Sequence, residues 1–540
     1  MGIIDQNDHV QRIRYNSMVH RMRKHEYPMI KGITYLDYGG TQLPSKSLTR
    51  SFSKQLQKYL ISNTHSALSS KSTSPQAIVD TARQDVLALF GASPEHFEVV
   101  FTANATAGVK LVAEALSGHK EGFSYFYHRD CHTSLVGVRE LASTSHCLAS
   151  DEETETWLDQ PTATEPQNHP TLFAYPAQSN MNGRRLPLEW SSRMRSSPSH
   201  KNTYTLLDIA ALASTTRIDL SDPSTAPDFL ALSFYKIYGY PDLGALIVRK
   251  SAARLFEQRR YFGGGTTASI ACGDGNDAWV VRKEKSLSAR LEDGTLPTHN
   301  ILALKCAIRV HQQLYGGLEQ ISQHVSWLTH ILHDKLNSLR HENGQLVCRI
   351  YTDPASDYTD PKTQGGVVAL NIMDPFGTCY SSGLVGEHAL KSNIHLRAGG
   401  LCNPAGMAQA LGYTAADLRY ARDAGYVCGV DLEPMGRPFG MVRVSLGASS
   451  TLSDVETFVR FVKWGFTELE CGKGWREGKL VGLRGVREEM RGEVQRVRQE
   501  FYERGSEGGT SSSEDFEGGK WVGKGLGLGV VRMWALVMRR

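Results

Sequence analysis

One stretch decides the fold: Ala231-Leu232-Ser233-Phe234-Tyr235-Lys236-Ile237-Tyr238-Gly239-Tyr240-Pro241. It sets Lys236 at the end of an apolar strand, just before a turn bounded by Gly239 and Pro241. A lysine amine becomes a useful nucleophile when burial and nearby cations lower its pKa, and a common use of such an amine is an imine with pyridoxal phosphate. Most lysines are solvated surface residues. The surrounding motifs therefore have to decide between the two interpretations.

An aspartate ends the preceding apolar strand. Asp208 closes residues 203–208 and lies 28 residues upstream of Lys236, a spacing that suits neighbouring strands of one sheet. Ligands of an open α/β sheet bind at the carboxyl ends of the strands, so we expect the two side chains to converge there. An aspartate beside a pyridine nitrogen keeps that ring protonated and electron-withdrawing. An aspartate that caps a helix or a turn would have the same place in the sequence.

A third motif predicts a phosphate site. Residues 99–110 read as a short β-branched strand, a run of small residues and the start of an apolar helix. The backbone N–H groups around Ala105 and the Thr106 hydroxyl would bind a phosphate, because donors at a helix N-terminus are unpaired and the helix dipole is positive there. The motif is neither a Walker loop nor a dinucleotide loop. A plain capped helix would look similar.

Together these residues resemble the class V aminotransferase family, and within it the NifS-like cysteine desulfurase domain of molybdenum cofactor sulfurases. The resemblance runs in family order from about residue 30 to 465. It rests on residues 35–41, 63–66, 101–106, 130–134, 173–180, 233–244, 261–266, 291–295, 395–404 and 443–447. It implies the α/β fold of type I pyridoxal-phosphate transferases, in which a large domain with a mostly parallel sheet is joined to a smaller α/β domain.

The resemblance also implies roles for single residues. Lys236 would bind pyridoxal 5'-phosphate covalently, Asp208 would pair with the pyridinium, and His132 would stack on the ring. The phosphate would be held by Thr106, Ala105 and Ser233, while Gln178 and Asn180 would reach the ring oxygen or the substrate. Thr266 follows three glycines and is similar to the residue that family members offer to the partner subunit's phosphate, which implies a homodimer. His132 precedes Thr133-Ser134 and could instead sit in a capped turn.

Sulfur chemistry is expected at Cys402. It lies in a glycine-loosened loop, 397–404, with Arg397 and His395 close by, where positive charge favours a thiolate. In relatives a cysteine of this loop becomes a persulfide, although a free cysteine is more often a buried, inert thiol. Arg443 is similar to the arginine that binds the substrate carboxylate, because its planar fork matches a carboxylate in two hydrogen bonds. We also expect Arg397 to contact the substrate.

The resemblance therefore implies an enzyme that moves sulfur from L-cysteine to a protein persulfide and then to an unknown acceptor, releasing alanine. A pyridoxal-phosphate C–S lyase, or an amino-acid modifying enzyme of a biosynthetic pathway, is the alternative. Molybdenum cofactor sulfurases carry a second, C-terminal domain that recognises the molybdenum cofactor. The resemblance does not extend to that domain. Relatives often have further cysteines in the loop, where this chain has Gly400 and Met407.

Composition fits a large enzyme. The 540 residues are 40% hydrophobic, and 60 basic against 56 acidic residues give a net charge of +4, which gives no reason to expect nucleic acid or a membrane as partner. Nine scattered cysteines without C-x-x-C spacing argue against a disulfide framework or a metal site. A reducing, cytoplasmic setting is the expectation, since residues 1–31 hold no apolar segment of a secretory signal.

Four segments are predicted along the chain. They are an N-terminal extension (1–30), the cofactor-binding large domain (31–320), a small domain (321–470) and a charged, Gly-rich tail (471–540). Within them, an apolar periodicity predicts a helix over 300–315 that pauses at Gly316-Gly317. The acidic, Thr-rich and Pro-rich stretch 149–170 and the Ser-rich stretch 194–202 are predicted to be surface insertions.

Overall fold

A seven-stranded sheet forms the centre of the computed structural model, which describes residues 6–64, 74–160, 170–426 and 436–467. Its strands are β2 (Phe97–Thr102), β3 (Ser124–His128), β4 (Thr144–Leu148), β5 (Thr171–Pro176), β6 (Thr203–Asp208), β7 (Phe229–Ser233) and β8 (Gly244–Arg249). They lie in the order β2-β8-β7-β6-β5-β3-β4, and only β8 runs antiparallel to its neighbours. The predicted mostly parallel sheet is therefore confirmed.

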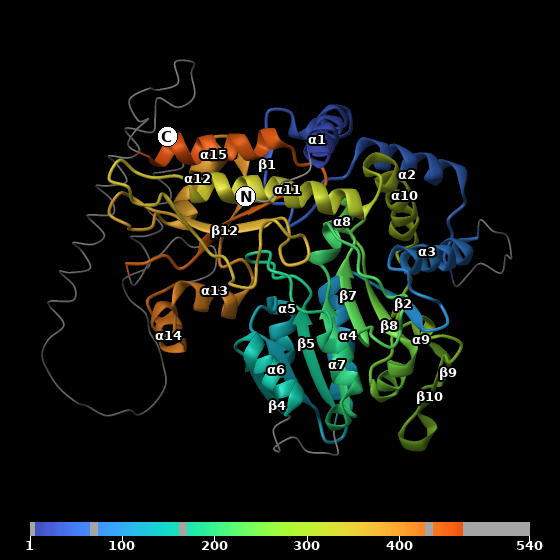
Figure 1. Ribbon diagram of the computed structural model, residues 1–540. Coiled ribbons are helices and arrows are strands. Elements are labelled where there is room, and N and C mark those ends of the chain that lie inside the picture. Colours follow the sequence, from blue (N-terminus) through green and yellow to red (C-terminus); the bar gives the residue numbers. More distant parts are fainter. Residues whose placement is uncertain (1–5, 65–73, 161–169, 427–435, 468–540) are drawn as a thin grey trace, which may run out of the picture. The chain divides into compact units, whose positions relative to one another are not determined.

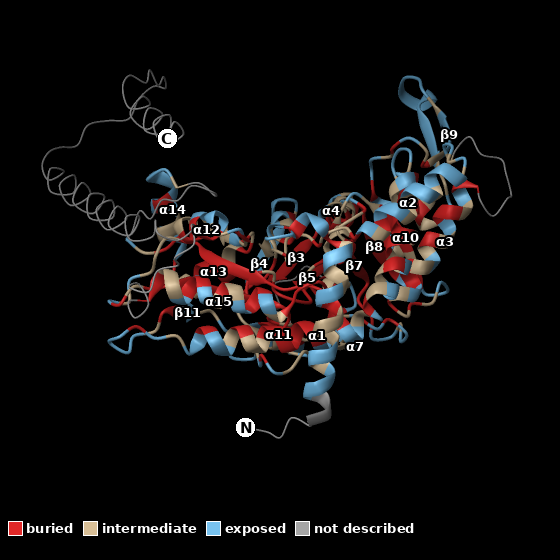
Figure 2. Cartoon of the chain, turned by 90° about the horizontal axis from the view of Figure 1, so that it is seen from above, coloured by how far each residue is buried: buried red, intermediate tan, exposed pale blue. Residues whose placement is uncertain are grey.

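Helices cover both faces of this sheet, which explains why its strands are nearly continuous apolar runs. One face packs α3 (Pro75–Leu89) and α10 (Thr298–Tyr315), with Val79 and Ile301 fully buried. The other face packs α4 (Ala105–Ser117) through Val109 and Val112. Buried residues concentrate in the strands, and exposed residues on the outer helix surfaces (Figure 2).

A second, antiparallel sheet makes the smaller core (Figure 1). It contains β11 (Cys348–Ile350), β12 (Val367–Ile372), β15 (Met441–Ser445) and β14 (Arg397–Gly399), in that order. The helices α11 (Leu318–Asn337), α12 (Ser382–Lys391) and α15 (Leu452–Phe466) pack against it and supply many of the other residues of this core. The remaining elements are α1 (Gln6–Glu26), β1 (Thr34–Tyr35), α2 (Lys46–Lys58), α5 (Thr133–Val136), α6 (Asp151–Asp159), α7 (Trp190–Ser196), α8 (Tyr235–Tyr238), β9 (Thr267–Ala271), β10 (Trp279–Arg282), α9 (Leu287–Leu291), β13 (Ile394–His395), α13 (Pro404–Leu411) and α14 (Ala415–Asp423).

The N-terminal residues pack on the smaller core. Tyr27 and Leu36 are buried in it, and β1 pairs in parallel with β13. Arg23 of α1 forms an ion pair with the buried Asp454 of α15. The predicted domain boundaries stay a prediction, but this core draws on both ends of the described chain.

The predicted helix over 300–315 is confirmed as α10. It ends at Gly316, whose φ of +77° is a conformation that glycine adopts without strain, and α11 begins two residues later. Within the described residues no helix is both long and apolar enough to cross a bilayer. The predicted tail, 471–540, lies outside the described residues.

The prediction of a surface insertion at 149–170 is wrong for its first part. Residues 151–159 form α6, and Trp157 stacks in the core against Phe126, with ring centroids 4.3 Å apart. The acidic residues that suggested a loop lie in the first helical turn, where the helix dipole favours negative charge, and Ser150 caps that turn. The stretch 194–202 is also partly internal, because Met194 and His200 are buried.

Candidate active site

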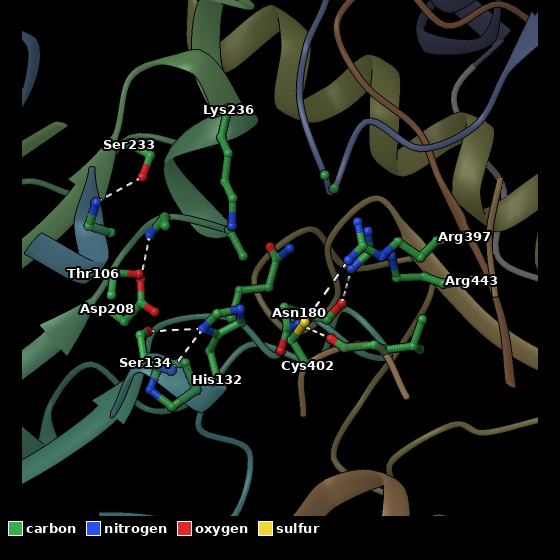
Figure 3. Close-up of a pocket in the computed structure, with 18 of the residues that line it drawn as sticks. Thr106, His132, Ser134, Asn180, Asp208, Ser233, Lys236, Arg397, Cys402 and Arg443 are labelled. Carbon is green, nitrogen blue, oxygen red and sulfur yellow. Dashed lines mark hydrogen bonds between the residues drawn. The ribbon is translucent and has the colours of Figure 1, made fainter. Parts of the chain in front are cut away.

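A cavity of about 190 Å³ lies at the carboxyl ends of β5, β6 and β7, where the two sheets meet. All the predicted site residues except Thr266 line it: Ala105, Thr106, His132, Gln178, Asn180, Asp208, Ser233, Lys236, Arg397, Cys402 and Arg443. Figure 3 shows Lys236 extending between Ser233, Thr106 and Asp208 on one side and Arg397, Arg443 and Cys402 on the other. The first group belongs to the large sheet and the helices that adjoin it, and the second to the smaller sheet and the loop after β14, so folding brings them together.

Lys236 sits on α8, a single turn that follows β7 directly. The turn closes at Gly239, where φ is +76° and a Cβ atom would meet the backbone of Leu43 at 2.3 Å. Burial lowers the pKa of the Lys236 amine; Asp208 opposes this shift, whereas Arg443 adds to it. The amine is therefore closer to its neutral, nucleophilic form than an exposed lysine.

Asp208 is the last residue of β6, the parallel neighbour of β7. One carboxylate oxygen, Oδ1, accepts a hydrogen bond from the Ala210 N–H at 2.9 Å. The aspartate thus caps the turn after the strand, which was one of the two roles predicted from the sequence. It also lines the cavity. Its position opposite Lys236 follows from strand adjacency, as the sequence spacing predicted.

The predicted phosphate site lies at the N-terminus of α4. Asn104 caps the helix by accepting from the Ala107 N–H at 3.0 Å, and the Ala105 N–H donates to Ser233 Oγ at 2.9 Å. The Ala105 N–H is therefore already engaged in the protein. Thr106, at the second helical position, leaves its hydroxyl and N–H as the first donors available to an anion, beside the Ser233 hydroxyl.

His132 has the capping role that its sequence allowed and also lines the cavity, while its stacking on a cofactor ring stays a prediction. It caps α5, because its Nδ1 accepts from the Ser134 N–H at 3.1 Å and lies 2.9 Å from Ser134 Oγ, and it lines the cavity. Since Nδ1 accepts a hydrogen bond, the proton of the neutral ring is on Nε2. Burial lowers the pKa of the imidazole, with Asp208 opposing the shift and Lys236 adding to it. A neutral ring suits stacking on a cofactor.

Cys402 projects into the cavity from a strained loop. Leu401 and Cys402 have φ of +54° and +56°, the left-handed region that residues other than glycine seldom adopt. Three contacts hold this conformation: Leu401 O accepts from Asn180 Nδ2 at 2.7 Å, Cys402 O accepts from the Thr133 N–H at 3.0 Å, and the Leu401 side chain is buried. Arg397 Nη2 lies 4.0 Å from Cys402 Sγ. Among the cysteines of the described ranges, Cys402 is the one that lines the cavity.

Arg443 is the buried cation of the site. Nη2 donates to Asp37 Oδ1 at 2.7 Å and Nη1 donates to the Asn180 carbonyl oxygen at 2.9 Å. Burial lowers the pKa of the guanidinium, and Asp37 opposes that shift. Gly39 allows this packing, because a Cβ atom there would lie 3.2 Å from Arg443 Cζ.

Asp37, whose Oδ1 accepts a hydrogen bond from Arg443, is a residue of the site that the sequence analysis did not predict. It lies within the matched stretch 35–41, and its other carboxylate oxygen is 4.0 Å from Arg397 Nη1. Because its segment is remote in sequence from every other site residue, nothing in the neighbouring residues indicates a role for Asp37 in the site. Its pairing with two arginines depends on the contact of residue 37 with β15, where it bridges to Ser445.

Thr266 is the predicted site residue that the fold places elsewhere. It is buried just before β9, and its hydroxyl donates to the Gly263 carbonyl oxygen at 2.7 Å. Its distance from the cavity of the same chain leaves the expected role toward a partner subunit as a prediction. The roles of the other residues stay predictions too, although their convergence is observed.

The residues present fit pyridoxal phosphate. The cavity offers a half-buried amine of lowered pKa, a carboxylate opposite it, a neutral imidazole and a helix N-terminus with two hydroxyls. Arg443 Nε is buried without a hydrogen-bond partner. Across the described ranges, no group of three or more His, Cys, Asp or Glu side chains is arranged to hold a metal ion.

Residues 34–458 match the model of the aminotransferase class-V family, and the chain belongs to that family. It is 48% identical over 458 residues to the molybdenum cofactor sulfurase of Aspergillus clavatus, a match that covers 84% of this chain and 54% of the relative. It is 49% identical to the sulfurase of Aspergillus niger, with 84% and 55% covered. The chain thus spans about half the length of these curated relatives.

Solved structures share the fold. The apo cysteine desulfurase of Thermococcus onnurineus superposes with a TM-score of 0.62 at 20% identity, over 82% of this chain and 97% of that one. A cystine C–S lyase, solved with its reaction product cysteine persulfide, superposes with a TM-score of 0.58 at 16% identity, over 81% and 99%. The predicted fold class and the resemblance to NifS-like proteins are therefore confirmed.

Proposed function

We propose that this protein is a pyridoxal-phosphate enzyme that takes sulfur from L-cysteine, leaves it as a persulfide on Cys402 and releases alanine. The observation that carries the proposal is a thiol, an amine of lowered pKa and a carboxylate-binding arginine in one cavity: Cys402, Lys236 and Arg443. Relatives named molybdenum cofactor sulfurase support the same chemistry.

Binding of the substrate falls to the arginines. Arg443 offers a planar donor fork to the α-carboxylate of cysteine, and Arg397 adds charge 4.0 Å from the thiol sulfur. The hydrogen bond from Arg443 to Asp37 fixes the orientation of the guanidinium before the substrate binds. Arg397 lines the same cavity and its side chain is partly exposed, so its guanidinium is open to the substrate carboxylate.

The pyridoxal ring supplies an electron sink for charge that develops beside the substrate nitrogen. Lys236 Nζ, whose pKa burial lowers, accepts and returns the proton of the substrate α-carbon. Cys402 Sγ attacks the substrate sulfur, so that the sulfur–carbon bond breaks and a sulfur–sulfur bond forms. One proton moves to the former sulfur-bearing carbon, which gives alanine, and the balance needs no outside oxidant.

The assembly and setting form part of the proposal. A homodimer is supported by the glycine run before Thr266, since family resemblance assigns that loop to a partner subunit's site. The free thiols at seven described cysteines suit a reducing compartment such as the cytosol. The final sulfur acceptor is a separate molecule or domain that accepts persulfide sulfur.

Product analysis tests the proposal. Incubation of the loaded enzyme with L-cysteine should give alanine and protein-bound persulfide. Pyruvate and free sulfide in place of alanine would contradict it and favour the C–S lyase, because a lyase eliminates sulfur without needing a thiol within reach.

A further inference from the structure

Arg185 is a largely buried cation beside the cavity that has no carboxylate partner among the described residues. Its guanidinium donates to three neutral acceptors: the Pro361 carbonyl oxygen, Thr216 Oγ1 at 2.7 Å and Gln178 Oε1 at 3.2 Å. Burial lowers the pKa of Arg185 to about 10, opposed by Asp360. A buried charge held only by neutral groups is costly, so its place next to a cavity residue calls for a role.

The role follows from the chemistry of the Arg185–Gln178 contact. Arginine donates hydrogen bonds and cannot accept them, so the atom of Gln178 that faces Arg185 has to be the carbonyl oxygen. The amide nitrogen Nε2 is thereby turned away from Arg185. Gln178 also packs closely over Gly365, where a Cβ atom would lie 2.2 Å from Oε1 and 2.7 Å from Nε2, so only glycine leaves room for the amide in this position. Gln178 lines the cavity between Pro176 and Asn180.

We propose that Arg185 is a positioning residue that fixes the Gln178 amide so that Nε2 donates a hydrogen bond to the ring oxygen of pyridoxal phosphate. This inference rests on the proposed function, since it concerns the cofactor of that site. A hydrogen bond donated to the ring oxygen withdraws electron density from it. The oxygen then holds the proton that it shares with the lysine-derived nitrogen less tightly, and that proton is lost at lower pH.

The visible absorbance of the bound cofactor reports this proton, so its pH midpoint is the measurement. Each protein is loaded with pyridoxal phosphate and its visible absorbance is titrated with pH. The proteins compared are the unaltered protein, Gln178→Leu, Arg185→Met, Arg185→Lys and the Gln178→Leu/Arg185→Met double variant. We expect Gln178→Leu and Arg185→Met to raise the midpoint by about one pH unit, equivalent to a tenfold change in proton affinity. The double variant should shift no further than Gln178→Leu, and Arg185→Lys should recover part of the shift, because it keeps a donor.

Arg195 provides the matched control. It is a partly buried arginine on α7 whose pKa burial also lowers, and it donates to the carbonyl oxygens of Pro223, Ser224 and Ala226, away from the cavity. Unlike Arg185 it also has a carboxylate partner, Asp228, at 3.6 Å, so it controls for the loss of a buried arginine and not for the lack of an ion pair. Arg195→Met should cost stability in urea and leave the midpoint unchanged. If Arg185→Met does not fold, Thr216→Val removes one anchor of Arg185 and should raise the midpoint by a smaller amount.

Three results would overturn the inference. A midpoint that moves in Gln178→Leu but not in either Arg185→Met or Thr216→Val would separate Arg185 from the amide. A midpoint unmoved by Gln178→Leu would show that the amide does not reach the ring oxygen. An unaltered protein that forms no visible chromophore would refute the proposed function itself, which distinguishes the two failures.

Discussion

Two regions of the cavity are built in different ways. The cofactor region, made of Thr106, Asp208, Ser233 and Lys236, stands on strand ends and a helix N-terminus in the large sheet unit. The thiol loop, residues 397–403, stands on a short edge strand of the smaller sheet and holds Leu401 and Cys402 in the left-handed region. The first region follows regular secondary structure, whereas the second depends on tertiary contacts.

The difference teaches where each region is vulnerable. Left-handed residues other than glycine each cost of order 1–3 kcal/mol, and persist where the surroundings fix them. Here the fixing contacts come from the large unit: Asn180 donates to Leu401 O, and the Thr133 N–H donates to Cys402 O. The thiol loop is therefore coupled to the cofactor region, whose own backbone needs no such support.

The largest effect on activity is expected from a substitution in the cofactor region. Lys236→Ala removes the amine that binds pyridoxal phosphate, so the purified variant should lose the visible absorbance of the covalently held cofactor and all measurable turnover. The thiol loop should keep its structure, since Lys236 makes no hydrogen bond to it among the described residues. Absorption spectroscopy checks this, and an unchanged spectrum would refute the role of Lys236.

The next largest effect is expected from a substitution that changes only the thiol loop. Cys402→Ser keeps the size of the side chain and removes the nucleophilic sulfur, so the variant should bind cofactor as before and form no persulfide, with alanine release falling to background. Cys147→Ser is the control, because it makes the same change at an exposed thiol that does not line the cavity. Alanine released by Cys402→Ser at the unaltered rate would show that another group accepts the sulfur.

A smaller effect is expected between the regions, at the arginine pair. Arg443→Lys keeps the charge but loses the planar fork, and a hydrogen bond to a charged group contributes about 1.5–3 kcal/mol, so KM for cysteine should rise roughly 10- to 100-fold. Asp37→Asn should raise KM less, because Arg443 keeps its bond to the Asn180 carbonyl oxygen. Steady-state kinetics check both. A fall in kcat at unchanged KM would contradict the assignment.

The last effect concerns acid stability. Burial lowers the pKa of His311 and of His324 to about 4, against about 6.5 in the unfolded chain. The folded protein therefore binds fewer protons, so the free energy of unfolding is highest above pH 6.5 and falls as the pH drops toward 4, by roughly 1 kcal/mol per pH unit for each histidine. Urea unfolding of the apo-protein at pH 7 and pH 5 measures this.

The two histidines also sharpen the comparison. His311 packs against Tyr238 of α8, beside the cofactor region, while His324 Nε2 donates to the Ser450 carbonyl oxygen in the smaller core. His311→Leu and His324→Leu should each reduce the loss of stability between pH 7 and pH 5. An equal loss in both variants and in the unaltered protein would show that neither histidine titrates in this range.

The sequence predicted the cofactor region well because its signals are local. Asp208 closes β6 and Lys236 lies in the helical turn that follows β7, and adjacency of parallel strands brings strand ends together. Family order supplied the thiol loop, but nothing local in it foretells consecutive left-handed residues. Asp37 lies in a matched stretch, but nothing local foretold its pairing with Arg443, and nothing local foretold the contact of Arg185 with the Gln178 amide. Helix α6 was missed because acidic residues at a helix start resemble a solvated loop.

Mass spectrometry of the loaded enzyme after a single turnover with L-cysteine tests the central claim most directly. The account predicts a gain of one sulfur atom, located by digestion to the peptide that contains Cys402, with one equivalent of alanine released. A protein whose mass stays unchanged while cysteine is consumed, or a sulfur found on another cysteine, would contradict it.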